Sequence, residues 1–512
     1  MTPDPASVTR GPAPRRRHDE RPALRLDGTS LSARRVAAAV RATGSLDLQL
    51  DHAALARVER AARLGSELST RRTVYGRTTG VGGNRDEVVN PEGTAGRTSH
   101  GLRLLRSHSG GAGERLAPEI VDAALLVRLN QLLTAHSGVS RDLTLALADA
   151  VRRGARPVVH RLGAIGTGDL APLAQIALAL AGEGAWDPAT GADPPDPVTI
   201  DAGDALAFVS SNAVTIAEAA LAAATLDVVL ASSEVVTALS YRALGGSPEA
   251  YAEPVHRARP HPGQVRCAAR MRHLLGMEGT PPPGRRIQDP FGLRAFPQVN
   301  GPAVDALETL HRVLDIEINA GAENPMIVLA VDDAYHHAHF HTAYVASGLD
   351  HTRACVHGVA ELSVARLGDL VEPEQTGLRA FLADGPPGSS GVMILEYIGH
   401  DALAALRQAA LPATLGTAVV SRGLEDHASF STQSARATTE VAVAYAHVLA
   451  CELVAAVRAL RQAAVEIDPA VPIAGALSRA DDVLDPSTDD RPLADDVAAA
   501  TSLVLDPTWS HL

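Results

Sequence analysis

The amino-acid sequence predicts an all-α fold, in which a long central helix bundle follows a smaller N-terminal domain of short helices and loops. Apolar residues recur every three or four positions over long stretches, strand-like alternation is scarce, and 46% of the 512 residues are hydrophobic. A chain of this length can bury a large core. We divide it into a polar, Pro-rich and disordered tail (1–20), an N-terminal domain (21–204) and a helix bundle (205–512).

The expected helices follow from the apolar spacing. The first clear one spans 116–136, where polar residues separate the apolar positions. Later helices exceed the usual length of about 8–20 residues and are apolar over much of their circumference, so they need neighbours on several sides. We therefore expect a bundle that other subunits complete. These longer helices are expected over 212–240, 302–319, 342–367, 402–420 and 438–467.

The absence of lysine excludes several kinds of chemistry. All 46 residues counted as Lys plus Arg are arginines. A pyridoxal-phosphate enzyme needs a lysine Schiff base, and both the Walker-type phosphate loop and the kinase site need a lysine for nucleotide phosphates. The usual forms of all three classes are therefore excluded.

Charge, cysteine content and apolar segments predict a cytoplasmic protein without a nucleic-acid or membrane partner. A net charge of −13 disfavours phosphate binding. The three cysteines lack CxxC spacing, which indicates a reducing compartment, and the first twenty residues lack the apolar segment of a secretory signal. The most apolar long stretch, 212–236, contains Glu218 and Asp227, which favours a buried helix over a membrane span.

Two glycine-rich segments carry the first candidate functional residues. Tyr75 lies in a glycine-rich loop, where it can approach a substrate and transfer a proton if its pKa is lowered; the alternative is a packing role. Thr167 stands between Gly166 and Gly168, just before the helix-starting Asp169. This pattern places its hydroxyl on a tight turn at a helix N-terminus, although an ordinary helix start gives the same pattern.

Three further segments carry charged or titratable side chains. Arg294 follows a turn and suits a substrate carboxylate by bidentate pairing. Glu425, with the adjacent Asp426 and His427, suits acid/base work or a solvated helix face. The histidines of 336–341 lack a carboxylate at the spacing of a zinc motif, so we expect no metal and interpret them as a loop that lines a cavity.

In this order the segments resemble the histidine and phenylalanine ammonia-lyase family, whose members carry a methylidene-imidazolone (MIO) electrophile. The resemblance covers the chain from about Tyr75 to His427. It rests on segments that are similar to the family's tyrosine loop (75–82), its Ser-His-Ala-Gly segment (107–110), its Ala-Ser-Gly-Asp-Leu-Ala-Pro-Leu signature (166–173), its Gln-Asp-Pro-Tyr-Ser-Leu-Arg and Pro-Gln-Val run (288–299), its Asp-Asn-Pro element (323–325), its Gly-Leu-Met-Ile helix start (391–394) and its Gln-Glu-Asp-His segment (425–427).

The resemblance implies an all-α homotetramer whose active sites are assembled from several chains, with a small amino-acid-like substrate. It implies catalytic roles for Tyr75 as base and Glu425 as acid/base partner, and a carboxylate clamp at Arg294. His108 resembles the residue of histidine- or tyrosine-selective members. The full set implied to contact substrate is His108, Ser210, Asn212, Phe291, Arg294, Asn324 and His341.

The departures from the family fall on the electrophile. The MIO group arises when the glycine nitrogen of Ala-Ser-Gly attacks the alanine carbonyl and two waters are lost. The tripeptide here is Gly166-Thr167-Gly168, so cyclisation would give a hindered ethylidene. Phe291 stands where the family has a tyrosine. Ser210 stands where the family has an asparagine, and the nearby Asn212 could take the role of that asparagine.

We therefore predict a carbon–nitrogen lyase that works by elimination or addition without a standard MIO group, on an amino-acid or related carboxylate substrate. One alternative is an ammonia-lyase or aminomutase with an MIO-like group derived from Thr167. The other is a catalytically inactive scaffold or binding homologue.

Overall fold

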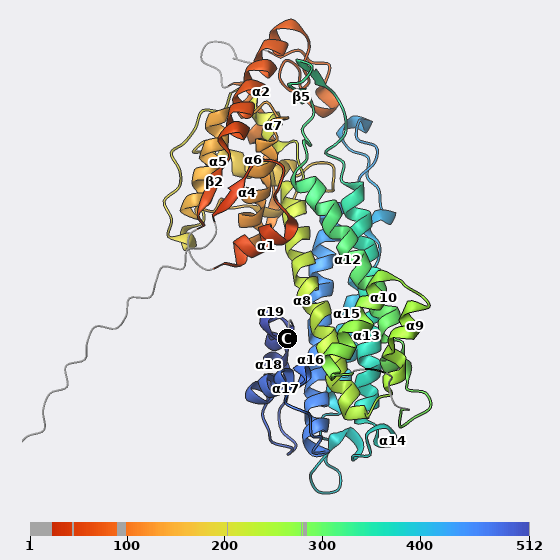
Figure 1. Ribbon diagram of the computed structural model, residues 1–512. Helices are drawn as coiled ribbons and strands as arrows, with labels where there is room; N and C mark the ends of the chain where they lie inside the picture. Colours follow the sequence, from red (N-terminus) through yellow and green to blue (C-terminus); the bar gives the residue numbers. More distant parts are fainter. Residues whose placement is uncertain are drawn as a thin grey trace, which may run out of the picture.

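The structure is a computed structural model, and it describes residues 23–510 except 43–45, 90–98, 202, 278 and 280–283. The predicted tail (1–20) lies outside the described residues. Figure 1 shows the N-terminal part of the chain at one end of a bundle of long helices. The predominantly helical architecture confirms the predicted all-α fold. The division of the chain at residues 204 and 205 stays a prediction.

The N-terminal part contains short helices and two small sheets. Strand β1 (Leu24–Leu26) pairs in parallel with β2 (Leu48–Leu50), and β3 (Ala112–Arg115) pairs antiparallel with β4 (His160–Leu162). The helices are α1 (Ala33–Arg41), α2 (His52–Arg71), α3 (His100–His108), α4 (Pro118–Leu133), α5 (Arg141–Arg153), α6 (Leu170–Leu180) and α7 (Asp204–Val209).

Long helices form the central bundle and continue into a small C-terminal group. The bundle contains α8 (Ala213–Leu244), α10 (Pro262–Leu275), α12 (Phe296–Ile318), α13 (Ala343–Val371), α15 (Ile394–Ala409) and α16 (Ser431–Gln462). The shorter elements are α9 (Glu253–Arg257), α11 (Phe291–Arg294), α14 (Pro373–Thr376), α17 (Pro472–Val483), α18 (Ala494–Val504), α19 (Pro507–Ser510) and the antiparallel pair β5 (Met326–Val328) and β6 (Asp333–Tyr335).

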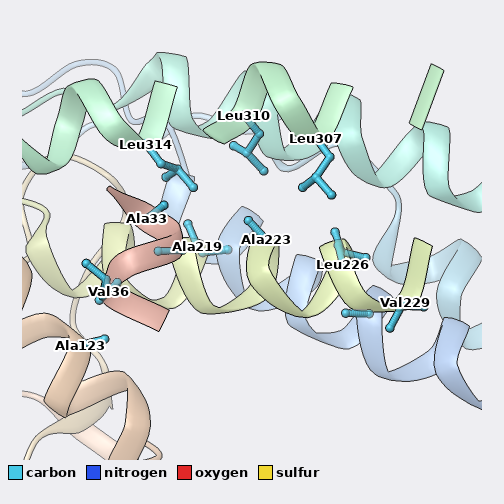
Figure 2. Packing of buried hydrophobic residues seen from close by; sticks show 14 of the residues in the cluster. Ala33, Val36, Ala123, Ala219, Ala223, Leu226, Val229, Leu307, Leu310 and Leu314 are labelled. Atoms are coloured by element: carbon cyan, nitrogen blue, oxygen red, sulfur yellow. The ribbon is translucent and has the colours of Figure 1, made fainter. Parts of the chain in front are cut away.

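Helix α8 lies at the centre of the core. Figure 2 shows its Ala219, Ala223 and Leu226 opposite Leu310 and Leu314 of α12, and all five side chains are buried. Alanine on α8 lets neighbouring helices approach closely, which explains why this helix is buried around most of its circumference. The stretch Asp204–Leu244 is apolar enough to cross a membrane, but 89% of its most apolar window is buried inside the protein, as in the core helix of a folded domain.

A buried ion pair joins two helices inside this core. Arg366 of α13 and Glu452 of α16 are fully buried, with Nε and Oε1 2.6 Å apart. Ser240 and Ser363 donate hydrogen bonds to the same carboxylate. The guanidinium also donates to the Gly292 carbonyl, which connects the pair to α11. Every charged group is thus compensated, as burial requires.

The predicted helices agree with the structure except at one place. We expected a helix over 402–420, but α15 ends at Ala409 and a short 3₁₀ turn over Ala413–Leu415 follows. Pro412, which lacks a backbone N–H, precedes that turn. The last residues of the predicted helix instead lie in a loop that carries part of the candidate site.

Candidate active site

A cavity of about 540 Å³ brings together residues that are distant in the sequence. Its wall includes apolar side chains of α3, α6 and α7, among them Leu104, Leu170 and Leu206. Seven of the residues singled out from the sequence also line it: Tyr75, His108, Thr167, Gly168, Ser210, Asn324 and Glu425.

The tyrosine loop holds the Tyr75 hydroxyl in a defined position. The hydroxyl oxygen accepts a hydrogen bond from the Gly82 amide at 2.6 Å. Burial raises the pKa of Tyr75; the hydrogen bond from Gly82 opposes this shift, and the nearby Glu425 carboxylate adds to it. The sequence-based role of Tyr75 required a lowered pKa, and the shift has the opposite direction. The phenol is therefore protonated in the free protein near neutral pH.

The Gly-Thr-Gly turn is tied to the starts of two bundle helices. Gly166 and Gly168 have φ angles of +83° and +112°, which suit residues without a Cβ. The Gly166 carbonyl accepts a hydrogen bond from Ser429 Oγ at 2.9 Å, just before α16. The Gly168 amide donates to Asn212 Oδ1 at 3.1 Å, at the start of α8. Thr167 thus sits on a turn that both helices anchor.

Asp169 fixes the other end of this turn. Its backbone amide donates to the Ser211 carbonyl, and its carboxylate accepts hydrogen bonds from the Thr215 amide at 2.7 Å and the Thr215 hydroxyl at 2.8 Å. Burial raises the pKa of Asp169 to about 6, although the bonds from Thr215 favour the charged form. Asp169 therefore positions α6 and does not line the cavity.

The residues of the turn depart from the Ala-Ser-Gly sequence from which an MIO group forms. A Cβ on Gly166, where the resembling family has alanine, would lie 2.1 Å from Ser429 Oγ and 2.7 Å from Ser431 Oγ. Thr167 also carries a methyl group on the carbon that would have to become a methylidene. The family's Ala-Ser-Gly cannot be accommodated without movement of Ser429 and Ser431.

His108 offers a hydrogen-bond acceptor to the cavity. It is the last residue of α3, and its Nδ1 lies 2.9 Å from the Leu104 carbonyl. Because a carbonyl only accepts, Nδ1 carries the proton in the neutral ring. The Nε2 atom is then the available acceptor for a donor group on a ligand.

Arg294 and Phe291 do not line the cavity of their own chain. The Arg294 guanidinium stacks on the Phe291 ring at 4.3 Å, and its Nε donates to the Asp289 carbonyl. Asp289 accepts a hydrogen bond from the Ser247 amide, just beyond the C-terminal end of α8. The 32 residues of α8 span about 48 Å, and Asn212 lies at the opposite end beside the cavity. Tyr75 and Arg294 of one chain therefore cannot act on the same substrate.

Other predicted site residues lie near the cavity wall without lining it. Asn212 accepts the hydrogen bond from the Gly168 amide and donates one to the Phe340 carbonyl. His341 Nε2 lies 3.0 Å from His427 Nδ1. Of the loop 336–341, only Phe340 reaches the cavity. The described residues contain no group of three or more metal-ligating side chains.

The sequence as a whole matches a known family. Residues 31–479 match the aromatic amino acid lyases, and the histidine ammonia-lyase of Symbiobacterium thermophilum is 34% identical over 462 residues, 88% of this chain and 90% of that protein. The chain belongs to the aromatic amino acid lyase family.

Solved structures of other proteins share the architecture. Histidine ammonia-lyase from Trypanosoma cruzi aligns with a TM-score of 0.83 and 27% identity over 94% of this chain and 92% of that one. Tyrosine aminomutase from Streptomyces globisporus aligns with a TM-score of 0.85 and 24% identity over 95% and 97% of the two chains, which shows the same fold.

In this member of the aromatic amino acid lyase family, sequence reasoning missed two arginines near the site. Arg128 of α4 is fully buried and donates to the Ala207 and Phe208 carbonyls, at 2.5 and 3.0 Å, and to Glu323 Oε1 at 2.8 Å. It thereby holds together the segments that carry Ser210 and Asn324. An arginine on an apolar helix was a usable signal. Arg422, which lines the cavity, gave none because its position depends on a loop.

Proposed function

We propose that this chain is a carbon–nitrogen lyase that eliminates an amine from an amino-acid-like carboxylate, or adds one, without a standard MIO group. The observation that supports this most strongly is the cavity that holds Tyr75, Thr167 and Glu425 together. A tyrosine and a carboxylate in one cavity can move a proton to and from a bound carbon acid.

Tyr75 would transfer the proton next to the leaving group. In elimination, its phenolate accepts the proton from carbon, and Glu425 in the same cavity is placed to take or return a proton. The raised pKa of Tyr75 makes the neutral phenol the resting form. At neutral pH this form is ready for the addition direction, in which the phenol donates the proton to carbon.

The missing electrophile restricts the substrate. An amine leaves poorly unless it is activated, and Gly-Thr-Gly stands here in place of the Ala-Ser-Gly from which the activating group forms in the family. A substrate of this site therefore carries a better leaving group or a more acidic C–H than a common amino acid.

The separation of Tyr75 and Arg294 supports a homotetramer. Arg294 cannot reach its own cavity, while Phe291 beside it is 64% exposed. In the proposed assembly, α11 of one chain completes the cavity of another and supplies the carboxylate clamp. Mixing Tyr75→Phe chains with Arg294→Gln chains should then restore activity, because some cavities receive both intact residues. Activity that stays absent in the refolded mixture would contradict shared sites.

Amine release from a panel of amino acids and their quaternary ammonium analogues tests the proposed reaction. We expect Tyr75→Phe to lose about 100-fold or more of kcat, since general acid–base groups contribute about 10²–10⁴-fold. Tyr397→Phe is the matched control, because this tyrosine is 66% exposed on α15. Equal rates for wild type and Tyr75→Phe would overturn the mechanism, and no amine release from wild type would favour the scaffold alternative. A β-amino acid product would instead identify an aminomutase.

A further inference from the structure

A hairpin beside the tyrosine loop places an arginine in the cavity that the proposed reaction does not use. Val420 and Glu425 pair through backbone hydrogen bonds, with the Val420 amide 2.8 Å from the Glu425 carbonyl. Arg422 lies at the tip of this hairpin. Val420, Arg422 and Glu425 all line the cavity, so the hairpin forms one of its walls.

The hairpin tip has an unusual and fixed backbone. Ser421 and Arg422 have φ angles of +56° and +58°, although neither is glycine. Two successive non-glycine residues in this region are strained, and they persist only where the surroundings hold them. Here the surroundings are the tyrosine loop. The Gly83 amide donates to Ser421 Oγ at 2.9 Å, and a Cβ on Gly83 would lie 2.8 Å from Arg422 Cδ.

No carboxylate among the described residues pairs with the Arg422 guanidinium. Among the described residues that line the cavity, it is the only arginine. Its side chain is exposed, and within the described ranges no carboxylate forms an ion pair with it, Glu425 included. A guanidinium held on a cavity wall without a partner is suited to bidentate binding of an anion.

We infer that Arg422 binds a second anionic group of the substrate, distinct from the α-carboxylate. The inference rests on the proposed function, in which Arg294 of a partner chain holds the α-carboxylate. The apolar wall around Leu104, Leu206 and Phe340 fits the substrate body between the two charges. The substrate class is thus an amino acid whose apolar or aromatic side chain ends in a carboxylate or similar anion.

Binding of two product-like acids tests this inference without turnover. trans-Cinnamate carries one carboxylate and trans-4-carboxycinnamate carries two, and isothermal titration calorimetry of the assembled protein gives both dissociation constants. We expect wild type to prefer the dicarboxylate, and Arg422→Gln to weaken its binding by about 10–100-fold, the usual worth of a charge-assisted contact, with cinnamate changed less than about threefold. Arg422→Lys should keep part of the preference.

Two controls separate the inference from its alternatives. Arg312→Gln removes an exposed arginine of α12 outside the cavity wall and should leave both constants unchanged. Arg294→Gln should weaken both acids alike. If Arg422→Gln also weakens both alike, Arg422 holds the shared carboxylate and the inference is wrong. No preference in wild type, or no binding of either acid, would overturn it as well. A failure of the proposed lyase reaction would appear in amine release and leave these binding results intact.

Discussion

Replacement of Gly166 by alanine tests whether this turn can accommodate the alanine of Ala-Ser-Gly, and the measured quantity is the free energy of unfolding. Gly166 has a φ of +83°, and a Cβ there would meet Ser429 Oγ at 2.1 Å and the Ser431 amide at 2.8 Å. The backbone conformation alone costs about 1–2 kcal/mol for an L-residue. Crowding against two fixed neighbours adds about 1–3 kcal/mol. The variant should thus lose about 2–5 kcal/mol of unfolding free energy.

Gly154→Ala is the matched control for this variant. Gly154 ends α5 with a φ of +70°, and nothing lies within 4 Å of the Cβ position. The Gly154→Ala variant should lose only the part of the unfolding free energy that comes from the unfavourable backbone conformation. An unfolding entropy of about 2.1 cal/mol/K per residue makes each kcal/mol worth about 1 °C for a chain of this length. Thermal unfolding at one protein concentration should place Gly166→Ala about 1–3 °C below Gly154→Ala. Equal midpoints would refute the claim that Ser429 and Ser431 exclude the family's alanine.

Three further predictions concern proton transfer and the core. Because burial raises the pKa of Tyr75, kcat/KM for elimination should rise about tenfold per pH unit between about pH 7 and 9 as the phenolate fraction grows; a flat profile would argue against a phenolate base. Burial raises the pKa of Glu218 to about 7, so the native state loses stability as pH rises from the unfolded value of 4.5 through 7. The unfolding free energy of Glu218→Gln should equal that of wild type below pH 4.5 and exceed it by at most about 3 kcal/mol above pH 7. In denaturant titrations, a difference between the two that stays constant with pH would contradict this origin. Glu452→Gln should destabilise the core by about 3–5 kcal/mol by leaving Arg366 without its charge partner, and Glu452→Leu/Arg366→Met should recover much of that loss in the same titrations.

The sequence predicted the helical architecture because helix periodicity is a local signal. It failed over 402–420, where apolar residues continue past the end of α15 but Pro412 precedes a 3₁₀ turn and a loop. Proline in the pattern was a local signal that we did not weigh sufficiently.

Seven residues of the cavity could be found from motif order, but their arrangement could not. Tyr75, Thr167 and Glu425 meet as expected, whereas Arg294 lies beyond the far end of α8. The local sequence does not indicate which chain of an assembly would supply a residue to a site. The direction of the Tyr75 pKa shift likewise depends on burial in the folded site. Arg422 lies in the cavity wall because a hairpin positions it, and no sequence motif predicts that hairpin.

The proposal that this chain works without a backbone-derived electrophile is tested most directly by the intact mass of the purified chain. We expect the mass of the unmodified polypeptide, with Gly166, Thr167 and Gly168 all retained as ordinary residues. A chain lighter by two waters, with the loss located in a peptide that contains Thr167, would contradict it.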